Sequence, residues 1–254
     1  MGVSIANLSK AFMVQNEEIP ILDNVSLDIR DGEFVTIVGH SGCGKSSLLK
    51  IIAGLVPYSS GSVEVNGKRV TGPDVDRGMV FQEHRLLPWL TVKDNIGFGL
   101  THLPKEQREG LITKYMQMIK LDGFGNAYPH QLSGGMAQRA SIARGLVANP
   151  SILLLDEPFG ALDALTRIQM QQEILRIWEE ARTTMILVTH DIDEAIYLGS
   201  RVIVLSSRPG RIVEVVPVEL ARPRDRGSSD FAYIKKKIYS HFFTDEPAGM
   251  EFAI

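Results

Sequence analysis

The chain has 254 residues, of which 44% are hydrophobic and 22% charged, so it can bury one large core and has an ordinary globular composition. Its formal net charge of -3 gives no whole-chain reason to expect nucleic acid as a partner. The single cysteine excludes an intramolecular disulfide, and no signal peptide or run of about 18 apolar residues is evident, so we expect a soluble, cytoplasmic protein.

The N-terminal region has the composition of β structure. Residues 3–8 and 25–29 are predicted short strands on either side of a polar loop at residues 16–18. Phe12 follows the first of these strands.

A glycine-rich loop comes next. Residues 39–46, Gly-His-Ser-Gly-Cys-Gly-Lys-Ser, match the phosphate-binding pattern G-x-x-x-x-G-K-[ST] at every fixed position. A predicted buried strand at residues 33–38 precedes them and a predicted helix at residues 47–53 follows, which is the context that this motif requires. Glycines let the backbone N–H groups face a polyphosphate, while Lys45 reaches its terminal phosphates and Ser46 ligates Mg²⁺. The alternative, a plain turn with an incidental lysine, is disfavoured by these flanks. The predicted nucleotide-binding residues of this loop are Gly39, His40, Ser41, Gly42, Cys43, Gly44, Lys45, Ser46 and Ser47.

The middle of the chain changes from strand to helix. Residues 62–67 predict a strand that runs into an Asn-Gly turn, and residues 78–82 form an apolar run that ends in Gln82. From about residue 91 to 148 the pattern is helical, and it includes a predicted helix at residues 105–120.

The second half alternates between the two kinds of element. Strands are predicted at residues 152–156, 184–189 and 201–205, with helices at residues 164–181 and from Asp191. Strands alternating with helices on both sides of a phosphate loop predict an α/β fold with a parallel sheet, into which the helical segment is inserted.

Two consecutive carboxylates follow the strand at residues 152–156, where open α/β sheets bind their ligands. Asp156 is suited to share a Mg²⁺ ion with Ser46, and Glu157 to accept a proton from an attacking water. Two acids that merely cap a strand are the alternative, which the nearby phosphate loop disfavours. His190 ends the next strand, where on its own it is more often an ordinary residue than a catalytic one.

Residues 132–139, Leu-Ser-Gly-Gly-Met-Ala-Gln-Arg, resemble the signature motif of ATP-binding cassette (ABC) ATPases. The order of motifs from about residue 3 to 215 is also similar to that family. The matching positions are the phosphate loop, Gln82 as the Q-loop, Leu132 to Gln138 as the signature, Asp156 and Glu157 as the Walker B pair, Ala161, Leu162 and Asp163 as the D-loop, and His190 as the H-loop.

The resemblance implies a P-loop NTPase with a RecA-like parallel-sheet core, an N-terminal antiparallel β subdomain and an inserted helical subdomain. It also implies ATP and Mg²⁺ as cofactors, and a head-to-tail dimer with two ATP molecules at its interface. In such a dimer the signature residues of one subunit hold the γ-phosphate bound by the other. The resemblance also assigns roles to individual residues. It implies that Glu157, His190 and Gln82 act in catalysis and that Ser46, Gln82 and Asp156 bind the metal. The residues that it assigns to nucleotide binding are Phe12, Ser133, Gly134, Gly135 and Asp163.

Two positions depart from the family pattern. Met136 stands where the family usually has glutamine, which leaves Gln138 as the nearby amide. Phe12 falls on the aromatic position that stacks on adenine, but it lacks a hydroxyl. Stacking and simple core packing both fit Phe12, and stacking is favoured because it needs only a ring face.

A finer resemblance lies in residues 86–96 and 207–212, which are similar to the importer ATPases of the nitrate, sulfonate and taurine group. It implies that residues 86–90 contact transmembrane permease subunits. Packing between subdomains remains an alternative for Leu86 and Leu87, whereas Trp89 beside a proline in a loop favours an interface.

The predicted function is therefore ATP hydrolysis that drives an importer of a small anion. The chain would lie at the cytoplasmic face of the inner membrane, peripheral through its permease, with an extracytoplasmic binding protein as an indirect partner. A soluble ABC ATPase that acts on nucleic acid or ribosomes is the alternative, but such proteins usually carry two cassettes or long coiled-coil insertions. A nucleotide-dependent interaction protein without turnover is disfavoured because Glu157 and His190 are both present.

We expect one ABC domain at residues 1–220, with its helical subdomain at about residues 83–150, and a short tail at residues 221–254. Residues 221–240 carry six basic and two acidic side chains. A patch that faces a bilayer and a solvated tail both fit this run, and the tail is favoured.

Overall fold

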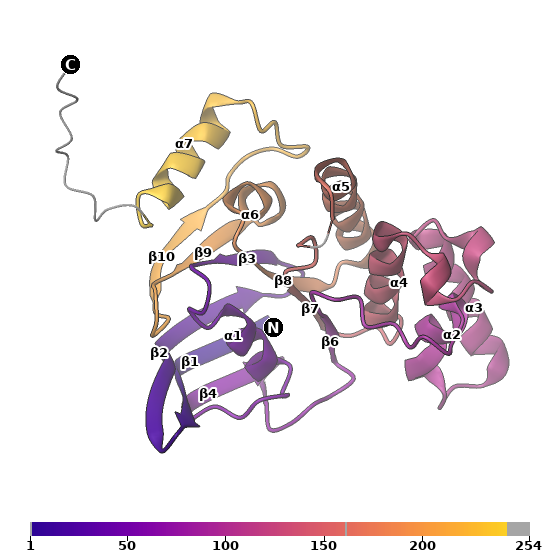
Figure 1. Ribbon diagram of the computed structural model, residues 1–254, viewed down its shortest axis with the longest axis horizontal. Coiled ribbons are helices and arrows are strands. Elements are labelled where there is room, and N and C mark those ends of the chain that lie inside the picture. Colours follow the sequence, from indigo (N-terminus) through magenta and orange to yellow (C-terminus); the bar gives the residue numbers. More distant parts are fainter. Residues whose placement is uncertain (1, 161, 243–254) are drawn as a thin grey trace.

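The computed structural model describes residues 2–160 and 162–242 and contains two sheets (Figure 1). The smaller sheet is antiparallel and has the strand order β2-β1-β4-β5. Its strands are β1 (Gly2–Val14), β2 (Glu17–Arg30), β4 (Ser60–Val65) and β5 (Lys68–Arg69). This is the predicted N-terminal antiparallel β subdomain.

Strands β1 and β2 form a long hairpin rather than two short segments around a loop. Val14 pairs with Glu17, so only Gln15 and Asn16 form the turn. Both have positive φ angles, 50° and 67°, which match the twist that a two-residue hairpin turn needs. The predicted polar loop at residues 16–18 was therefore placed too late in the chain, and both strands are longer than predicted.

The larger sheet has six strands in the order β10-β9-β3-β8-β7-β6. They are β3 (Phe34–Val38), β6 (Arg77–Val80), β7 (Ile152–Asp156), β8 (Thr184–Thr189), β9 (Arg201–Leu205) and β10 (Ile212–Pro217). All neighbours pair in parallel except β10, an antiparallel edge strand. Every residue of β3, β7 and β8 is buried, which explains why they appear in the sequence as unbroken apolar runs.

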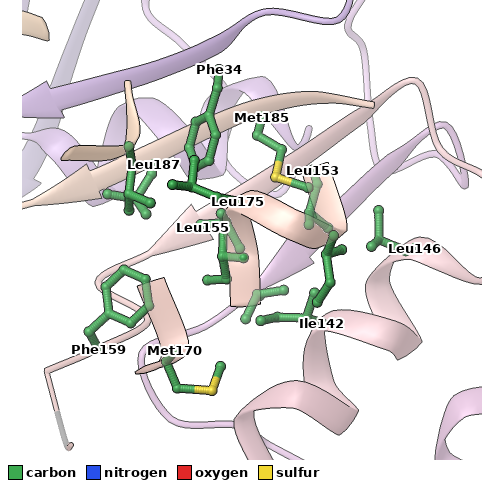
Figure 2. Close-up of a cluster of buried hydrophobic side chains, with 14 of the residues drawn as sticks. Phe34, Ile142, Leu146, Leu153, Leu155, Phe159, Met170, Leu175, Met185 and Leu187 are labelled. Carbon is green, nitrogen blue, oxygen red and sulfur yellow. The ribbon is translucent and has the colours of Figure 1, made fainter. Parts of the chain in front are cut away.

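Two hydrophobic clusters cover opposite faces of this sheet. Because side chains alternate along a strand, Leu153 and Leu155 of β7 point to one face, and Ile152 and Leu154 to the other. Figure 2 shows the first cluster, in which Leu155 lies among side chains that include Phe34, Phe159 and Leu187. The second cluster joins the sheet to the smaller sheet and to α1 (Lys45–Ile52).

The chain between β6 and β7 is helical, as predicted, and extends to one side of the sheets (Figure 1). It contains α2 (Val92–Ile96), α3 (Lys105–Met118) and α4 (Gly134–Leu146), with short 3₁₀ turns η1 (Gly97–Leu100), η2 (Asp122–Phe124) and η3 (Pro129–Gln131). Helix α4 joins the segment to the sheet by a close approach to β6: a Cβ atom on Gly78 would lie 2.5 Å from the carbonyl oxygen of Gly145. No helix in residues 2–160 or 162–242 is long and apolar enough to cross a membrane.

Within the described residues after β7 there are three α-helices, namely α5 (Ala164–Ala181), α6 (Ile192–Leu198) and α7 (Ser229–Tyr239). Helix α7 packs against α6, with Phe231 and Ile238 buried (Figure 1). The prediction of a solvated tail over residues 221–240 is therefore wrong for this helix. The charge composition was misleading, because Lys235 pairs with Asp193 of α6 and Lys237 pairs with Glu214 of β10. Phe231 and Ile238 of the same helix are buried. Residues 243–254 of the expected tail lie outside the described residues.

Arg224 fixes this C-terminal segment to the end of α6 and to the chain at Val218. Its guanidinium is buried and donates to the carbonyl oxygens of Val218 at 3.0 Å and Tyr197 at 3.1 Å, and also to those of Ile196 and Gly199. Burial, together with the neighbouring charge of Arg222, lowers the pKa of Arg224 to about 10, so the group stays charged at neutral pH. Arg224 thus satisfies carbonyl groups at the end of α6 that water does not reach.

Replacement of Arg224 by methionine is expected to lower the free energy of unfolding by about 3 kcal/mol, because it leaves several buried carbonyl groups without a donor. Urea unfolding followed by circular dichroism would measure the change. The matched control is Lys236→Met on the exposed side of α7, for which we expect a change within about 0.5 kcal/mol. Equal stability of the two variants would contradict an anchoring role for Arg224.

Candidate active site

The strand order brings the predicted motifs to one edge of the larger sheet. The phosphate loop follows β3, His190 follows β8 and Glu157 follows β7, and these three strands are parallel neighbours. The carboxyl ends of parallel strands meet at the same edge, so residues more than 100 positions apart in the sequence lie side by side.

The phosphate loop has a backbone that only glycine suits at some positions. Gly42 and Gly44 have φ angles of 77° and 103°, in the left-handed region. A Cβ atom on Gly44 would also lie 2.7 Å from Cδ2 of Leu22. The loop therefore needs these glycines to curve tightly and to bring its backbone close to a ligand, as the motif predicts.

Lys45 lies at the centre of this curve. Its Nζ atom donates to the carbonyl oxygens of Gly39 at 2.7 Å and His40 at 3.0 Å, and the side chain is buried. The loop thus holds the ammonium group in place. Cys43 is also buried, and burial raises the pKa of its thiol, so its side chain is a neutral packing group and only its backbone can face a phosphate.

The predicted metal ligands Ser46 and Asp156 are in contact. The Ser46 hydroxyl donates to Oδ1 of Asp156 at 2.7 Å, and Asp156 is largely buried. In the described part of the chain no group of three or more His, Cys, Asp or Glu side chains could hold a metal. Two hard oxygen donors fit Mg²⁺ well, because it takes few protein ligands and completes its shell with water and phosphate oxygens.

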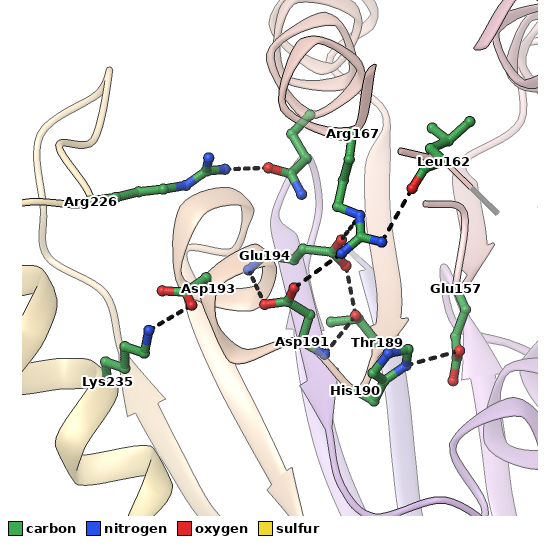
Figure 3. A network of polar contacts seen from close by, with 11 residues as sticks. Glu157, Leu162, Arg167, Thr189, His190, Asp191, Asp193, Glu194, Arg226 and Lys235 are labelled. Carbon is green, nitrogen blue, oxygen red and sulfur yellow. Dashed lines mark hydrogen bonds and ion pairs between the residues drawn. The ribbon is translucent and has the colours of Figure 1, made fainter. Parts of the chain in front are cut away.

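Glu157 and His190 face each other directly. Nδ1 of His190 lies 3.1 Å from Oε2 of Glu157 (Figure 3). Glu157 has a φ angle of 44°, and its N–H donates to the carbonyl oxygen of Val188 at 3.0 Å. The chain turns sharply there, and the carboxylate lies at the edge of the hollow that holds the phosphate loop.

A polar network joins the residues on either side of His190 in the chain to α5 and α6 (Figure 3). The Thr189 hydroxyl donates to Oε2 of Glu194 at 2.7 Å and accepts from the Asp191 N–H at 3.0 Å. Arg167 of α5 forms ion pairs with Asp191 at 3.7 Å and Glu194 at 3.8 Å. Burial raises the pKa of Glu194. Sequence reasoning missed Thr189 and Glu194, although acids in the first turn after His190 indicate a capped helix start.

Phe12 lies in the same hollow as the phosphate loop. This hollow has a volume of about 350 Å³ and is also lined by Ile21, Lys45, Ser47 and Glu157. The ring is 37% exposed and does not belong to either hydrophobic core, so the alternative of core packing is wrong. The ammonium group of Lys10 lies over the ring, 4.6 Å from its centroid, so stacking on a base would use the opposite face.

Gln82 does not meet the predicted metal ligands. Its side chain is exposed and lies beside the turn at Gly160, where a Cβ atom would be 3.4 Å from Nε2 of Gln82. Among the described residues its amide makes no hydrogen bond to Ser46 or Asp156. The structure therefore places Gln82 near the turn that follows Glu157, just after β6, the strand next to β7 in the sheet.

The signature residues lie apart from the phosphate loop of the same chain. The Ser133 side chain caps α4 by accepting from the Met136 N–H at 3.3 Å, and Gly134 and Gly135 form the first turn of that helix. Ser133 and Gly135 line a different hollow, whose walls contain no phosphate-loop residue. Gln138 is buried, so it cannot replace the amide that Met136 lacks at the surface.

Asp163 caps α5. Its Oδ1 accepts from the N–H groups of Leu165 and Thr166, both at 3.1 Å. Hydrogen bonding to the Thr166 side chain, together with these backbone N–H groups, lowers the pKa of Asp163. The structure therefore gives this carboxylate a partner within its own helix rather than at the phosphate loop. Ala161 of the predicted D-loop lies outside the described residues.

The predicted permease surface divides into two parts. Leu86 is buried, which supports packing rather than a surface contact, whereas Trp89 is 70% exposed. Asn95 holds the loop between them: its Oδ1 accepts from the Leu87 N–H at 2.7 Å, and its Nδ2 donates to the carbonyl oxygens of Leu87 and Leu90, both at 3.1 Å. Sequence reasoning missed Asn95, a fully buried polar residue whose pairing only the structure reveals.

Comparisons with known proteins agree with this arrangement. The family profile described as ABC transporter matches residues 22–160. The aliphatic sulfonates import ATP-binding protein SsuB of Bacillus subtilis (strain 168) is 48% identical over 253 residues, which cover 100% of this chain and 98% of the relative. SsuB of Bacillus cereus (strain ZK / E33L) is 48% identical and covers 95% of this chain and 96% of its own length.

The fold also matches solved structures. A dimeric structure of the ATP-binding cassette MJ0796, in a post-hydrolysis state bound to ADP and Pi, is 35% identical with a TM-score of 0.74. The match covers 86% of this chain and all of that one. The predicted α/β fold, with its RecA-like parallel core and antiparallel β subdomain, is confirmed. On the evidence of its motifs, its fold and these relatives, the chain belongs to the ABC transporter family and is one of its ATP-binding cassettes.

Proposed function

We propose that this chain hydrolyses ATP with Mg²⁺ to energise an importer of aliphatic sulfonates. The observation that carries the proposal is the contact between Glu157 and His190. This contact lies at the same edge of the sheet as Lys45 of the phosphate loop. The hydrogen-bonded pair of Ser46 and Asp156 lies at that edge too. A site that only bound nucleotide would not need a carboxylate and an imidazole opposite its phosphate loop.

Each side chain has a role that its position supports. Lys45 and the loop backbone bind the phosphates, and the ring of Phe12 stacks on the base. Ser46 and Asp156 would hold Mg²⁺, which neutralises charge on the phosphates.

Glu157 accepts the proton of the attacking water. His190 contacts Glu157 and lines a hollow together with Gly39, His40 and Ser41, so it lies where it can contact the terminal phosphate.

The separation of two hollows supports a dimer. Because Ser133 and Gly135 line a hollow that the phosphate loop does not enter, they can reach a nucleotide only on a second copy. A head-to-tail arrangement would place the first turn of α4, with its free N–H groups, against that nucleotide's phosphate. The dimeric structures of the MJ0796 cassette are consistent with such an arrangement.

The relatives' names support the transported class, since several are aliphatic sulfonates import proteins that match along almost their whole length. The permease and its binding protein would select the sulfonate, and this chain would sit at the cytoplasmic face of the membrane. We infer that residues 1–220 form the cassette and that residues 83–150 are its helical subdomain. Residues 221–242 form a C-terminal segment that packs against the cassette through α7.

The test is growth of a bacterial strain that lacks the ATP-binding subunit of its sulfonate importer and that carries this chain in its place. Growth on an alkanesulfonate as sole sulfur source is expected, and sulfate serves as the permissive control. Growth on taurine but not on an unsubstituted alkanesulfonate would refute the substrate class. Restored growth on nitrate as sole nitrogen source, in a strain that lacks the ATP-binding subunit of its nitrate importer, would also refute it. Absence of Mg²⁺-dependent ATP hydrolysis by the purified chain would refute the activity.

Trp89 allows the permease surface to be tested separately. Trp89→Ala is expected to weaken association with the permease by about 2 kcal/mol or more, because an exposed tryptophan on a fixed loop is typical of binding hot spots. ATP hydrolysis by the isolated chain should not change. Permease pull-down measures the first effect, and Tyr233→Ala on α7, where the ring is 71% exposed, is the matched control. If the two variants pulled down equal amounts of permease, the prediction that Trp89 contacts the permease would be wrong.

A further inference from the structure

The loop between β9 and β10 passes against the phosphate loop. The Gly210 N–H donates to the carbonyl oxygen of Ile21 at 2.8 Å, and the Asp23 N–H donates to that of Gly210 at 3.0 Å. A Cβ atom on Gly210 would lie only 2.2 Å from the carbonyl oxygen of Cys43. This loop is therefore held between β2 and the phosphate loop, with no room for a side chain at the point of contact.

Other contacts fix the same loop. The Ser206 hydroxyl donates to the carbonyl oxygen of Pro209 at 2.9 Å and accepts from the Arg211 N–H at 2.9 Å. Arg211 also donates through Nε to Asp23 at 2.8 Å, which ties the loop to β2 by an ion pair. The backbone that carries Arg208 is thus rigid, although its side chain is exposed.

Arg208 points toward the phosphate loop. Its Nη2 atom lies 3.8 Å from where a Cβ atom on Gly42 would be, and its side chain lines the same hollow as Phe12, Lys45 and Glu157. Unlike Arg211, it makes no ion pair or hydrogen bond with any described residue. The hollow thus contains an arginine whose charge is not neutralised by the protein, next to a loop built to bind an anion.

We propose that Arg208 is a further nucleotide-binding residue, whose guanidinium contacts the phosphate oxygens of the bound nucleotide. Guanidinium groups pair with phosphate through two parallel hydrogen bonds, and the rigid loop lowers the entropy lost on binding. Arg208 approaches from the exposed rim at Gly42, whereas Lys45 acts from the buried side of the loop. The inference rests on the proposed function, since it assumes that the phosphate loop binds ATP.

Titration calorimetry with two probes tests it: ATP, and inorganic tripolyphosphate, which has phosphates but no base. Arg208→Gln is expected to raise the Kd for both probes by about tenfold, the loss expected for a charge-assisted hydrogen bond. Arg208→Lys should lose less, because it keeps the charge but not the paired geometry. Lys68→Gln, which removes an exposed charge on β5, should leave both values unchanged.

Two results would overturn the inference. An unchanged Kd for both probes in Arg208→Gln would show that the Arg208 side chain does not contact the bound nucleotide. A weaker ATP complex with unchanged tripolyphosphate binding would move the contact to the base or ribose. Lys45→Ala separates this inference from the proposed function: if it still bound ATP as tightly as the wild type, the phosphate-loop assignment would fail, and the role of Arg208 with it.

Discussion

Glu157→Gln is expected to lower the rate of ATP hydrolysis by about 10²-fold or more while ATP binding persists. Glutamine has the same size and can still donate a hydrogen bond toward His190, but it cannot accept the proton of the attacking water. The phosphate loop and the pair of Ser46 and Asp156 do not depend on this side chain, so the nucleotide should remain bound.

A nucleotide that binds but is not cleaved should hold two chains together. Size-exclusion chromatography of the Glu157→Gln variant with Mg-ATP is expected to show twice the monomer mass, alongside a phosphate-release assay. The control is Glu106→Gln, which neutralises an exposed carboxylate on α3 and should retain wild-type turnover. If the Glu157→Gln variant stayed monomeric and hydrolysed ATP at the wild-type rate, Glu157 would not be the general base.

Lys45→Ala is expected to weaken ATP binding by roughly 100-fold or more, because it removes the charged donor at the centre of the phosphate loop. Fluorescence titration with a labelled ATP analogue measures this loss. The substitution also leaves the carbonyl oxygens of Gly39 and His40 without their donor, so thermal unfolding of the free variant should be recorded beside it.

The comparison variant is Lys105→Ala, whose lysine lies on the exposed surface of α3. If Lys45→Ala folds like this control but does not bind the analogue, the loss belongs to the phosphate site. Unchanged affinity in Lys45→Ala would contradict the assignment of the loop.

The predicted permease surface and the C-terminal segment show where sequence patterns were misleading. Leu86 and Trp89 are both large apolar residues in one loop, yet the first is buried and the second exposed. Asn95 fixes the loop that carries both residues by forming hydrogen bonds with the backbone of Leu87. No sequence pattern near Asn95 predicts these hydrogen bonds. Arg224 has the appearance of a solvated charge in the sequence, whereas the end of α6 and the chain at Val218 surround it with carbonyl groups.

The sequence by itself determined the features that depend on near neighbours in the chain. The glycines of the phosphate loop set its curvature through their own φ angles, and the apolar runs of β7 and β8 identified strands with their observed bounds. The motif order also identified the family, because each motif is a short segment with its own chemistry.

Tertiary structure alone decided which of these segments meet. The order of β3, β8 and β7 in the sheet places His190 against Glu157, and the loop after β9 brings Arg208 to Gly42. The same packing keeps Ser133 in a hollow separate from Lys45. These distances depend on strand pairing between distant parts of the chain, and a linear pattern carries no information about the energy of such pairing.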